Sequence, residues 1–272
     1  MNQDKIKKIL LSIADAPLEF SVILSGKKSG KVNGLYKTDS REIILHNRNF
    51  TPDPTGDNLL VYTAIHEYAH HLHCCARGGN LSSRAHTSEF WAIFHELLEK
   101  AEKKNIYLNV FTNSPELEKL TIQIKQKFLE ENGNLVKELG KQLLRASDLC
   151  DKIGGRFEDY VDRILRIPKN AANLAIKMYE YDLNPGLGAD NMRYLAGIRN
   201  EDDRNGAQKA LLAGKSPDSV KTALKTRSVS ALTQSEEDQK ERLEKEKVRL
   251  ERTISTLNSR LKEVKEALGK IM

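Results

Sequence analysis

Residues 56–95 read GDNLLVYTAIHEYAHHLHCCARGGNLSSRAHTSEFWAIFH, and this stretch decides the fold of the chain around it. Within it, HEYAH fits the pattern H-E-x-x-H. Residues four apart share one face of a helix, so His66 and His70 can bind one metal ion while Glu67 transfers a proton beside it. The apolar residues that precede the motif predict the helix it requires, with Asp57 as the N-cap.

A catalytic zinc ion needs a third protein ligand and one open coordination position. The segment 75–85 contains two glycines and two serines and is expected to turn the chain back towards His86, sixteen residues after His70. A second amphipathic helix follows directly. His86 is the expected third ligand, and Glu89 is the alternative, because a carboxylate from a following helix can also bind zinc. If His86 binds the metal, Glu89 is placed to cap its helix or to orient a ligand histidine.

The other histidines are not expected to bind the metal. His71 and His73 are expected at the surface or along the cleft, whereas His46 and His95 are expected to be structural. The aromatic residues at 90–91 are expected in the core.

The pairing of HEYAHH with a later HTSEFW resembles the SprT-like metallopeptidases, the family of the Spartan DNA–protein crosslink protease. The resemblance covers roughly residues 15–110. It implies an α+β, zincin-like metallopeptidase domain in which a short sheet accompanies the active-site helices. The residues it carries over are the zinc ligands His66, His70 and His86 and the general base Glu67.

Cysteine usage departs from that family. SprT-like proteins often carry a later zinc ribbon of paired cysteines, but this chain has only Cys74, Cys75 and Cys150, with no C-x-x-C pair. Substrate recognition must therefore come from another part of the chain. Three cysteines, two of them adjacent, do not make a disulfide framework, and the N-terminus does not read as a secretory signal, so a cytoplasmic location is expected.

Composition limits the remaining possibilities. The chain has 272 residues, enough for two domains and an appendage. No run approaches the roughly 18 apolar residues of a membrane helix, so no membrane partner is expected. The 44 basic and 38 acidic residues give a net charge of +6 that is spread along the chain. Nucleic-acid binding would therefore need a local basic patch.

The N-terminal region is expected to form a helix and a small sheet. The helix covers 4–14, and strands are predicted at 18–24, 32–38 and 41–46, the last two as a hairpin. A further strand is predicted at 106–111. The edge of such a sheet could bind an extended peptide by backbone pairing, without demanding a sequence.

A helical region follows Ser114-Pro115, which is typical of a helix start. Long helices are predicted at 115–131 and 135–153, the second ending at Gly154-Gly155. Phe157 to Ile164 and Ala171 to Tyr181 form a predicted helix-turn-helix, and three short helices follow, around 189–197, 201–213 and 217–226.

The order of these helices resembles the DNA-binding region of ParB and KorB-type proteins over about 70 residues. The second helix of the motif could lie in a major groove. The expected contacts to bases and phosphates come from Arg163, Arg166, Lys169, Asn170, Asn173 and Lys177. The alternative is a helical bundle that only packs or binds protein.

The C-terminal region begins with a polar linker at 228–237 and then repeats apolar residues every seven positions. The seam comprises Leu243, Leu250, Ile254, Leu257, Leu261, Val264, Leu268 and Ile271. This pattern predicts a coiled coil of about four heptads, interrupted by Lys247, and hence a homo-oligomer. The alternative is one long helix that folds back on the protein.

Together these features predict three parts: 1–112, a SprT-like metallopeptidase domain; 113–231, an all-α DNA-binding domain; and 232–272, a coiled coil. The expected function is hydrolysis of DNA-associated or DNA-crosslinked proteins by a zinc (Zn2+) metallopeptidase. One alternative is a regulatory protease that cleaves a repressor or partner through protein contacts. The other is a DNA-binding or scaffolding protein with a structural zinc site. The protein substrate, the preferred DNA and the restraint on activity are not encoded in any recognisable motif.

Overall fold

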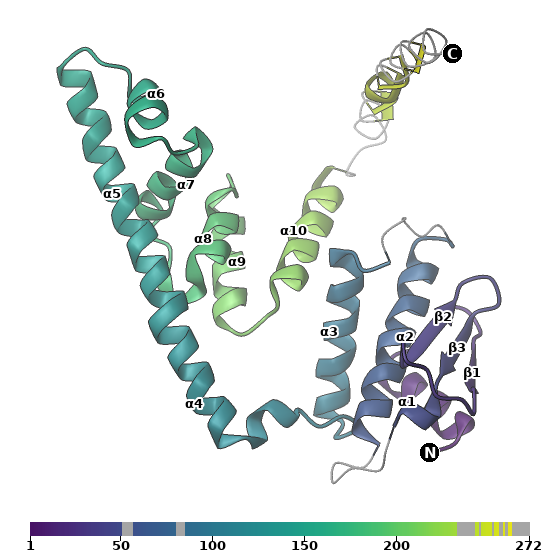
Figure 1. The fold of residues 1–272 in the computed structure, drawn as a ribbon. Coiled ribbons are helices and arrows are strands. Elements are labelled where there is room, and N and C mark those ends of the chain that lie inside the picture. Colours follow the sequence, from purple (N-terminus) through teal and green to yellow (C-terminus); the bar gives the residue numbers. More distant parts are fainter. Residues whose placement is uncertain are drawn as a thin grey trace, which may run out of the picture. The chain divides into compact units, whose positions relative to one another are not determined.

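The computed structural model contains a mostly helical chain with one three-stranded sheet (Figure 1). It describes residues 1–50, 57–79 and 85–232, together with 243–244, 246–251, 253–255, 258 and 261–262. The chain divides into two compact units, Met1–Thr222 and Ala223–Met272. The predicted boundary near residue 112 lies within the first unit and stays a prediction.

The N-terminal part consists of one helix and the small sheet. Its elements are α1 (Gln3–Ile13), β1 (Ser21–Leu24), β2 (Gly34–Lys37) and β3 (Glu42–Leu45). The strand order is β1-β3-β2, with β1 parallel and β2 antiparallel to β3, so the predicted hairpin is confirmed. Ile43 and Leu45 of the central strand are fully buried against Leu10 of α1 and the helices that follow. Because β2 lies at an edge, its outer backbone groups are not paired within the sheet.

Two helices complete this part. They are α2 (Asn58–Ala76) and α3 (Ser88–Lys103), which lie side by side (Figure 1). Ile65, Tyr68 and Phe94 are fully buried among them. The turn Asn47–Asn49 links the sheet to this pair of helices.

The strand predicted at 106–111 is wrong. This segment pairs with no strand among the described residues and ends in the 3-10 turn Val110–Asn113. Instead, the Asn58 side chain accepts a hydrogen bond from the Leu108 N–H at 2.8 Å and donates one to the Leu108 carbonyl at 3.0 Å. A side chain therefore satisfies the backbone groups that a neighbouring strand would have satisfied.

The two long helices predicted after Ser114 form one almost continuous rod. It consists of α4 (Pro115–Ile124), a π-helical turn labelled η3 (Lys125–Glu130) and α5 (Glu131–Lys152). Ser114 caps α4 by accepting the N–H of Leu117, as predicted. The break predicted between the two helices is absent, and Gly133 is a helical residue of α5. Glycine occupies this position because the backbone at Pro185 packs closely against it. A Cβ there would lie 2.5 Å from the Pro185 carbonyl oxygen.

The helix-turn-helix is confirmed as local structure. Its first half runs through α6 (Phe157–Asp159) and the π-helical turn η4 (Tyr160–Leu165), and its second half is α7 (Lys169–Glu180). Arg166 adopts a left-handed conformation, φ 56°, which turns the chain between them. The remaining elements of this part are η5 (Pro185–Leu187), α8 (Gly188–Ala196), α9 (Glu201–Leu212) and α10 (Pro217–Leu232).

The predicted coiled coil is described only in part. Leu243, Leu250, Ile254 and Leu261 are exposed residues in helical conformation, between 51% and 65% accessible. The other seam residues, Leu257, Val264, Leu268 and Ile271, lie outside the described residues. Pairing through this seam stays a prediction. Among the described helices, none is both long enough and apolar enough to cross a membrane.

Candidate metal centre

Three histidines, two from α2 and one from the segment just before α3, come together beside the sheet. His66 and His70 are one turn apart on α2, and His86 lies just before Thr87, which caps α3 by accepting the N–H of Phe90. The Nε2 atoms of His66 and His86 are 3.1 Å apart. One ligand atom from each histidine lies within 4.8 Å of the others, so this group could hold a metal ion.

The surroundings of the histidines keep two of the rings neutral. Burial lowers the pKa of His66 to about 4 and that of His70 to about 3. Neutral imidazole is the form that binds metal ions, so no proton has to leave these two rings at neutral pH. Phe90 stacks on the His70 ring at 4.2 Å, and Trp91 stacks on the His86 ring at 5.5 Å.

Glu67 is the buried carboxylate of the site. Only 6% of its surface is exposed, although the residue lines the cleft. Burial raises the pKa of Glu67 to about 7, while a hydrogen bond from the Tyr36 backbone N–H acts in the opposite direction. A carboxyl group with a pKa near 7 can both accept and return a proton at neutral pH.

The edge strand β2 approaches this carboxylate closely because residue 34 has no side chain. A Cβ on Gly34 would lie 3.0 Å from Glu67 Cγ, 3.0 Å from Thr63 Cγ2 and 3.1 Å from Leu45 Cδ2. Any larger residue would push the strand away from α2 or displace Glu67. Gly34 therefore helps to set the distance between the sheet edge and the candidate base.

An open cleft of about 580 Å³ contains these groups. Its walls come from β2 and the residues just before it, from α2, and from the start of α3. The lining residues are Val32, Asn33, Gly34, Leu35, Tyr36, Thr38, Tyr62, Thr63, His66, Glu67, His70, Ala85, His86 and Trp91. An edge strand thus runs along the same cleft as the three histidines. Phe90 is a core residue, as predicted, whereas Trp91 is half-buried, packs against the core and also lines the cleft.

Glu89, the second residue of α3, is not part of the histidine cluster. Among the described residues, the metal-binding group consists of the three histidines and does not include Glu89. The Glu89 carboxylate is close enough to His73 for its negative charge to act on that histidine. This charge raises the pKa of His73, whereas burial, the larger effect, lowers it. This arrangement favours His86 over Glu89 as the third ligand.

His71 and His73 are not surface residues. They are 0% and 1% exposed, so the surface interpretation is wrong. His71 Nδ1 lies 3.0 Å from the Tyr36 hydroxyl, and its Nε2 lies 3.1 Å from the Leu18 carbonyl oxygen. Because α2 packs between the sheet and α3, residues on more than one of its faces are enclosed. Tyr36, which joins β2 to His71 and lines the cleft, is a site residue that the sequence did not indicate.

His46 and His95 have structural contacts, as predicted. His46 Nδ1 is 2.9 Å from Ser25 Oγ, and His95 Nδ1 is 2.8 Å from Ser216 Oγ.

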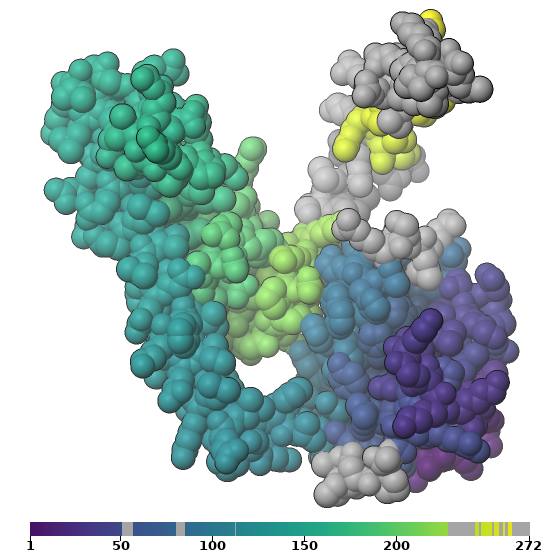
Figure 2. Space-filling model, viewed as in Figure 1, coloured from purple at the N-terminus to yellow at the C-terminus, as the bar shows by residue number. Residues whose placement is uncertain are grey.

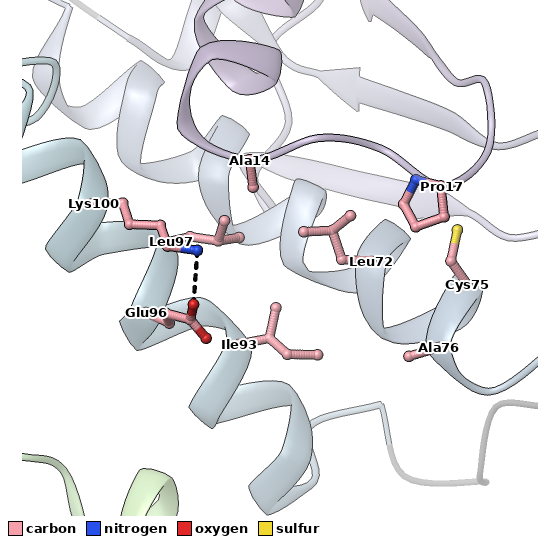
Figure 3. Close-up of a pocket in the computed structure, with 9 residues that line it drawn as sticks. All are labelled: Ala14, Pro17, Leu72, Cys75, Ala76, Ile93, Glu96, Leu97 and Lys100. Atoms are coloured by element: carbon pink, nitrogen blue, oxygen red, sulfur yellow. Dashed lines mark ion pairs between the residues drawn. The ribbon is translucent and has the colours of Figure 1, made fainter.

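A second hollow, of about 490 Å³, lies between α2, α3 and the segment after α1 (Figure 3). Leu72, Ile93 and Leu97 line it, and an ion pair between Lys100 and Glu96 crosses its rim at 2.7 Å. It shares no lining residue with the cleft and contains none of the three clustered histidines. This hollow therefore contributes nothing to the metal centre.

The residues predicted to contact DNA are accessible. Arg163, Arg166, Lys169, Asn170 and Asn173 are exposed, and Lys177 is half-buried. Two of the cations have acidic partners. Arg163 pairs with Asp159 at 3.0 Å, and Lys169 pairs with Asp162 at 3.5 Å. The surface of the helix-turn-helix is therefore of mixed charge, and a phosphate would have to compete with these carboxylates.

Comparison of the sequence with protein-family models and with curated proteins gives no match, and comparison of the structure with solved structures gives none. The geometry of the cleft must therefore carry any functional argument.

Proposed function

We propose that this chain is a zinc-dependent peptidase with a zincin-like catalytic domain. The observation that carries the proposal is the meeting of His66, His70 and His86 within 4.8 Å, with Glu67 in the same cleft. Three neutral nitrogen ligands with one open position form the donor set of catalytic zinc sites. The resemblance to SprT-like enzymes supports the same choice of metal and reaction.

In this proposal, different residues of the cleft bind the metal, transfer the proton and bind the substrate. A zinc ion bound to the three histidines would polarise the scissile carbonyl and lower the pKa of a water molecule. Glu67 takes the proton from the attacking water and passes it to the leaving amine. The outer edge of β2 binds the substrate main chain in an extended form by backbone hydrogen bonds. Because such pairing ignores side chains, it suits an enzyme that accepts many sequences.

Protein bound or crosslinked to DNA is the substrate class we propose. The exposed polar residues at the start of α7 support it, since Lys169, Asn170 and Asn173 are accessible for contacts with a duplex. DNA bound by the helical part would raise the local concentration of protein attached to the same duplex.

A cleavage assay tests the proposal. The intact chain and Glu67→Gln, each loaded with zinc, are incubated with a DNA-binding protein, in the presence and absence of the DNA that it binds. We expect DNA-dependent cleavage by the intact chain and none by Glu67→Gln. Cleavage that is equal in both proteins would rule out the proposed role of Glu67. Cleavage that is unaffected by DNA would leave a peptidase with another kind of substrate.

A further inference from the structure

One side of α5 carries an apolar seam that no other part of the described chain covers. Its four large residues are Leu135, Leu139 and Leu149 of α5 and Ile153, which directly follows the helix; they are 70%, 44%, 58% and 81% exposed. Gln142 and Ala146 occupy the two positions between the pairs. The six positions alternate by four and three residues, which is the spacing of a coiled-coil seam.

The seam is distinct from the face by which α5 packs in its own unit. Gly133, Gly140 and Leu143 are buried on α5, which packs against α7, α8 and η5. Figures 1 and 2 show α7 and α8 following one side of the rod, which is teal in both views. A second helix on the seam would therefore not replace any contact that already exists.

The large residues are placed symmetrically along the seam. Two lie at each end, and Gln142 and Ala146 lie between them, so the large residues occupy the same positions when the seam is read in reverse. In an antiparallel pair centred near residue 144, Leu135 meets Ile153 of the second copy. Leu139 then meets Leu149, and Gln142 meets Ala146. Each of these contacts occurs twice about the two-fold axis, and large side chains meet large ones at both ends of the pair.

We propose that α5 pairs antiparallel with α5 of a second copy of this chain through this seam. Burial of the aliphatic side chains from both copies drives the association. The proposal is independent of the peptidase function.

The polar groups near the seam are compatible with such a pair. Glu138 flanks the seam and would face Lys152 of the second copy, and the two-fold axis creates this pair twice. The Gln142 amide donates to Glu138 at 2.7 Å and accepts from Arg145 at 3.3 Å, so its nitrogen and its oxygen each keep a partner when the seam is covered. Arg145 of one copy would face Arg145 of the other. Both side chains are exposed, so salt screens the repulsion between them.

The paired segment is short, since the 18 steps from Leu135 to Ile153 span about 27 Å at 1.5 Å each. The seam would therefore associate weakly by itself. The predicted C-terminal coiled coil would hold two copies together and raise the effective concentration of one α5 for the other.

Site-directed crosslinking of the intact chain tests the pairing. Glu138→Cys and Lys152→Cys, mixed as two single variants or combined in one chain, are treated with a short thiol-specific crosslinker. We expect covalent dimer at several times the yield of either single variant alone. Each single variant also measures the background from Cys74, Cys75 and Cys150. The matched control is Asn134→Cys with Asp148→Cys, which has the same 14-residue separation on exposed positions away from the seam.

A second substitution separates seam pairing from chance proximity. Leu139→Glu, added to the crosslinking pair, should abolish the dimer product, whereas Leu117→Glu on α4 should not. Both leucines are surface residues, 44% and 38% exposed, so folding is preserved and helix content measured by circular dichroism checks this. A yield no higher than that of the single variants and the control overturns the proposal. A crosslink between two copies of residue 138, identified by mass spectrometry of the crosslinked peptides, also overturns it, because only a parallel or shifted pair brings these two positions together.

Discussion

At the scale of single residues, the candidate metal centre depends on three histidines that lie close together, two of which burial keeps neutral. Replacing His66, His70 or His86 with alanine should lower zinc content from about one per chain to near zero. Glu67→Gln should keep the zinc, because Glu67 is not one of the clustered ligands. Metal analysis after dialysis measures this. Glu89→Ala is the control, with at most the 10–100-fold weaker binding typical of an outer residue. Loss of zinc in Glu89→Ala but not in His86→Ala would reverse the ligand assignment.

Gly34 should matter for activity although it carries no side chain. In Gly34→Ala the new Cβ meets Glu67 and Thr63 at 3.0 Å, so the edge strand or the carboxylate must shift. Relief of this contact needs a shift of a few tenths of an ångström, and a shift of about 1 Å at a reacting group can cost about 100-fold in rate. We expect peptidase activity to fall several-fold while zinc content stays the same.

The matched control for this substitution is Gly30→Ala, where nothing lies within 4 Å of the new Cβ. Unchanged activity in both variants would show that the approach of β2 does not set the position of Glu67.

At the scale of elements, the glycines of α5 are packing positions. A Cβ at Gly140 would lie 2.0 Å from the Ala175 carbonyl oxygen, so Gly140→Ala must separate α5 from α7. Overpacking of this kind typically costs about 1–3 kcal/mol. Gly206→Ala in α9 is the opposite case, since nothing lies within 4 Å, and it should stabilise the helix by about 0.5–1 kcal/mol.

Thermal unfolding followed by circular dichroism compares these two variants with the parent chain. The midpoint should fall for Gly140→Ala and rise slightly for Gly206→Ala. Equal midpoints would mean that α5 and α7 can separate without cost.

The α7 helix is the element on which the proposed DNA binding depends. If Lys169 and Lys177 contact phosphates, replacing both with alanine should weaken duplex binding and flatten its dependence on salt. The slope should fall by about 0.9 for each lost phosphate contact. Fluorescence anisotropy of labelled DNA at several salt concentrations measures this with the intact chain. Lys119→Ala with Lys125→Ala, two exposed residues of the α4 rod, is the control pair. An unchanged slope in the α7 variant would leave the helix-turn-helix as a protein-binding or packing element.

At the scale of the whole molecule, self-association should depend on the C-terminal seam. In an isolated helix Leu243, Leu250, Ile254 and Leu261 face water, as their exposure of 51–65% indicates. Burying each side chain contributes about 1.5–3 kcal/mol before ordering costs are subtracted. A chain that ends at Gln234 should therefore dissociate to monomers at much higher concentration than the intact chain. Sedimentation of both over a concentration series is the measurement, and identical behaviour would exclude pairing through the C-terminal residues.

Sequence alone determined the features that depend on near neighbours. The H-E-x-x-H spacing placed His66 and His70 on one helical face because a helix repeats every 3.6 residues. Alternating apolar residues and turn signals located the hairpin, and Ser114-Pro115 and Gly154-Gly155 located the ends of the rod. Each of these patterns acts over a few residues, so it can be recognised without knowledge of the fold.

The tertiary structure decided the features that join residues far apart in the chain. Gly133 is a good helix breaker by local preference, but close packing against Pro185 makes it a helical residue. Residues 106–108 have strand-forming side chains, yet the side chain of Asn58 satisfies the backbone of Leu108. His71 is polar but enclosed, because Tyr36 and the Leu18 carbonyl, 35 and 53 residues away, supply its hydrogen-bond partners. Such contacts have no local signature, because the free energy of each depends on partners that only the folded chain brings together.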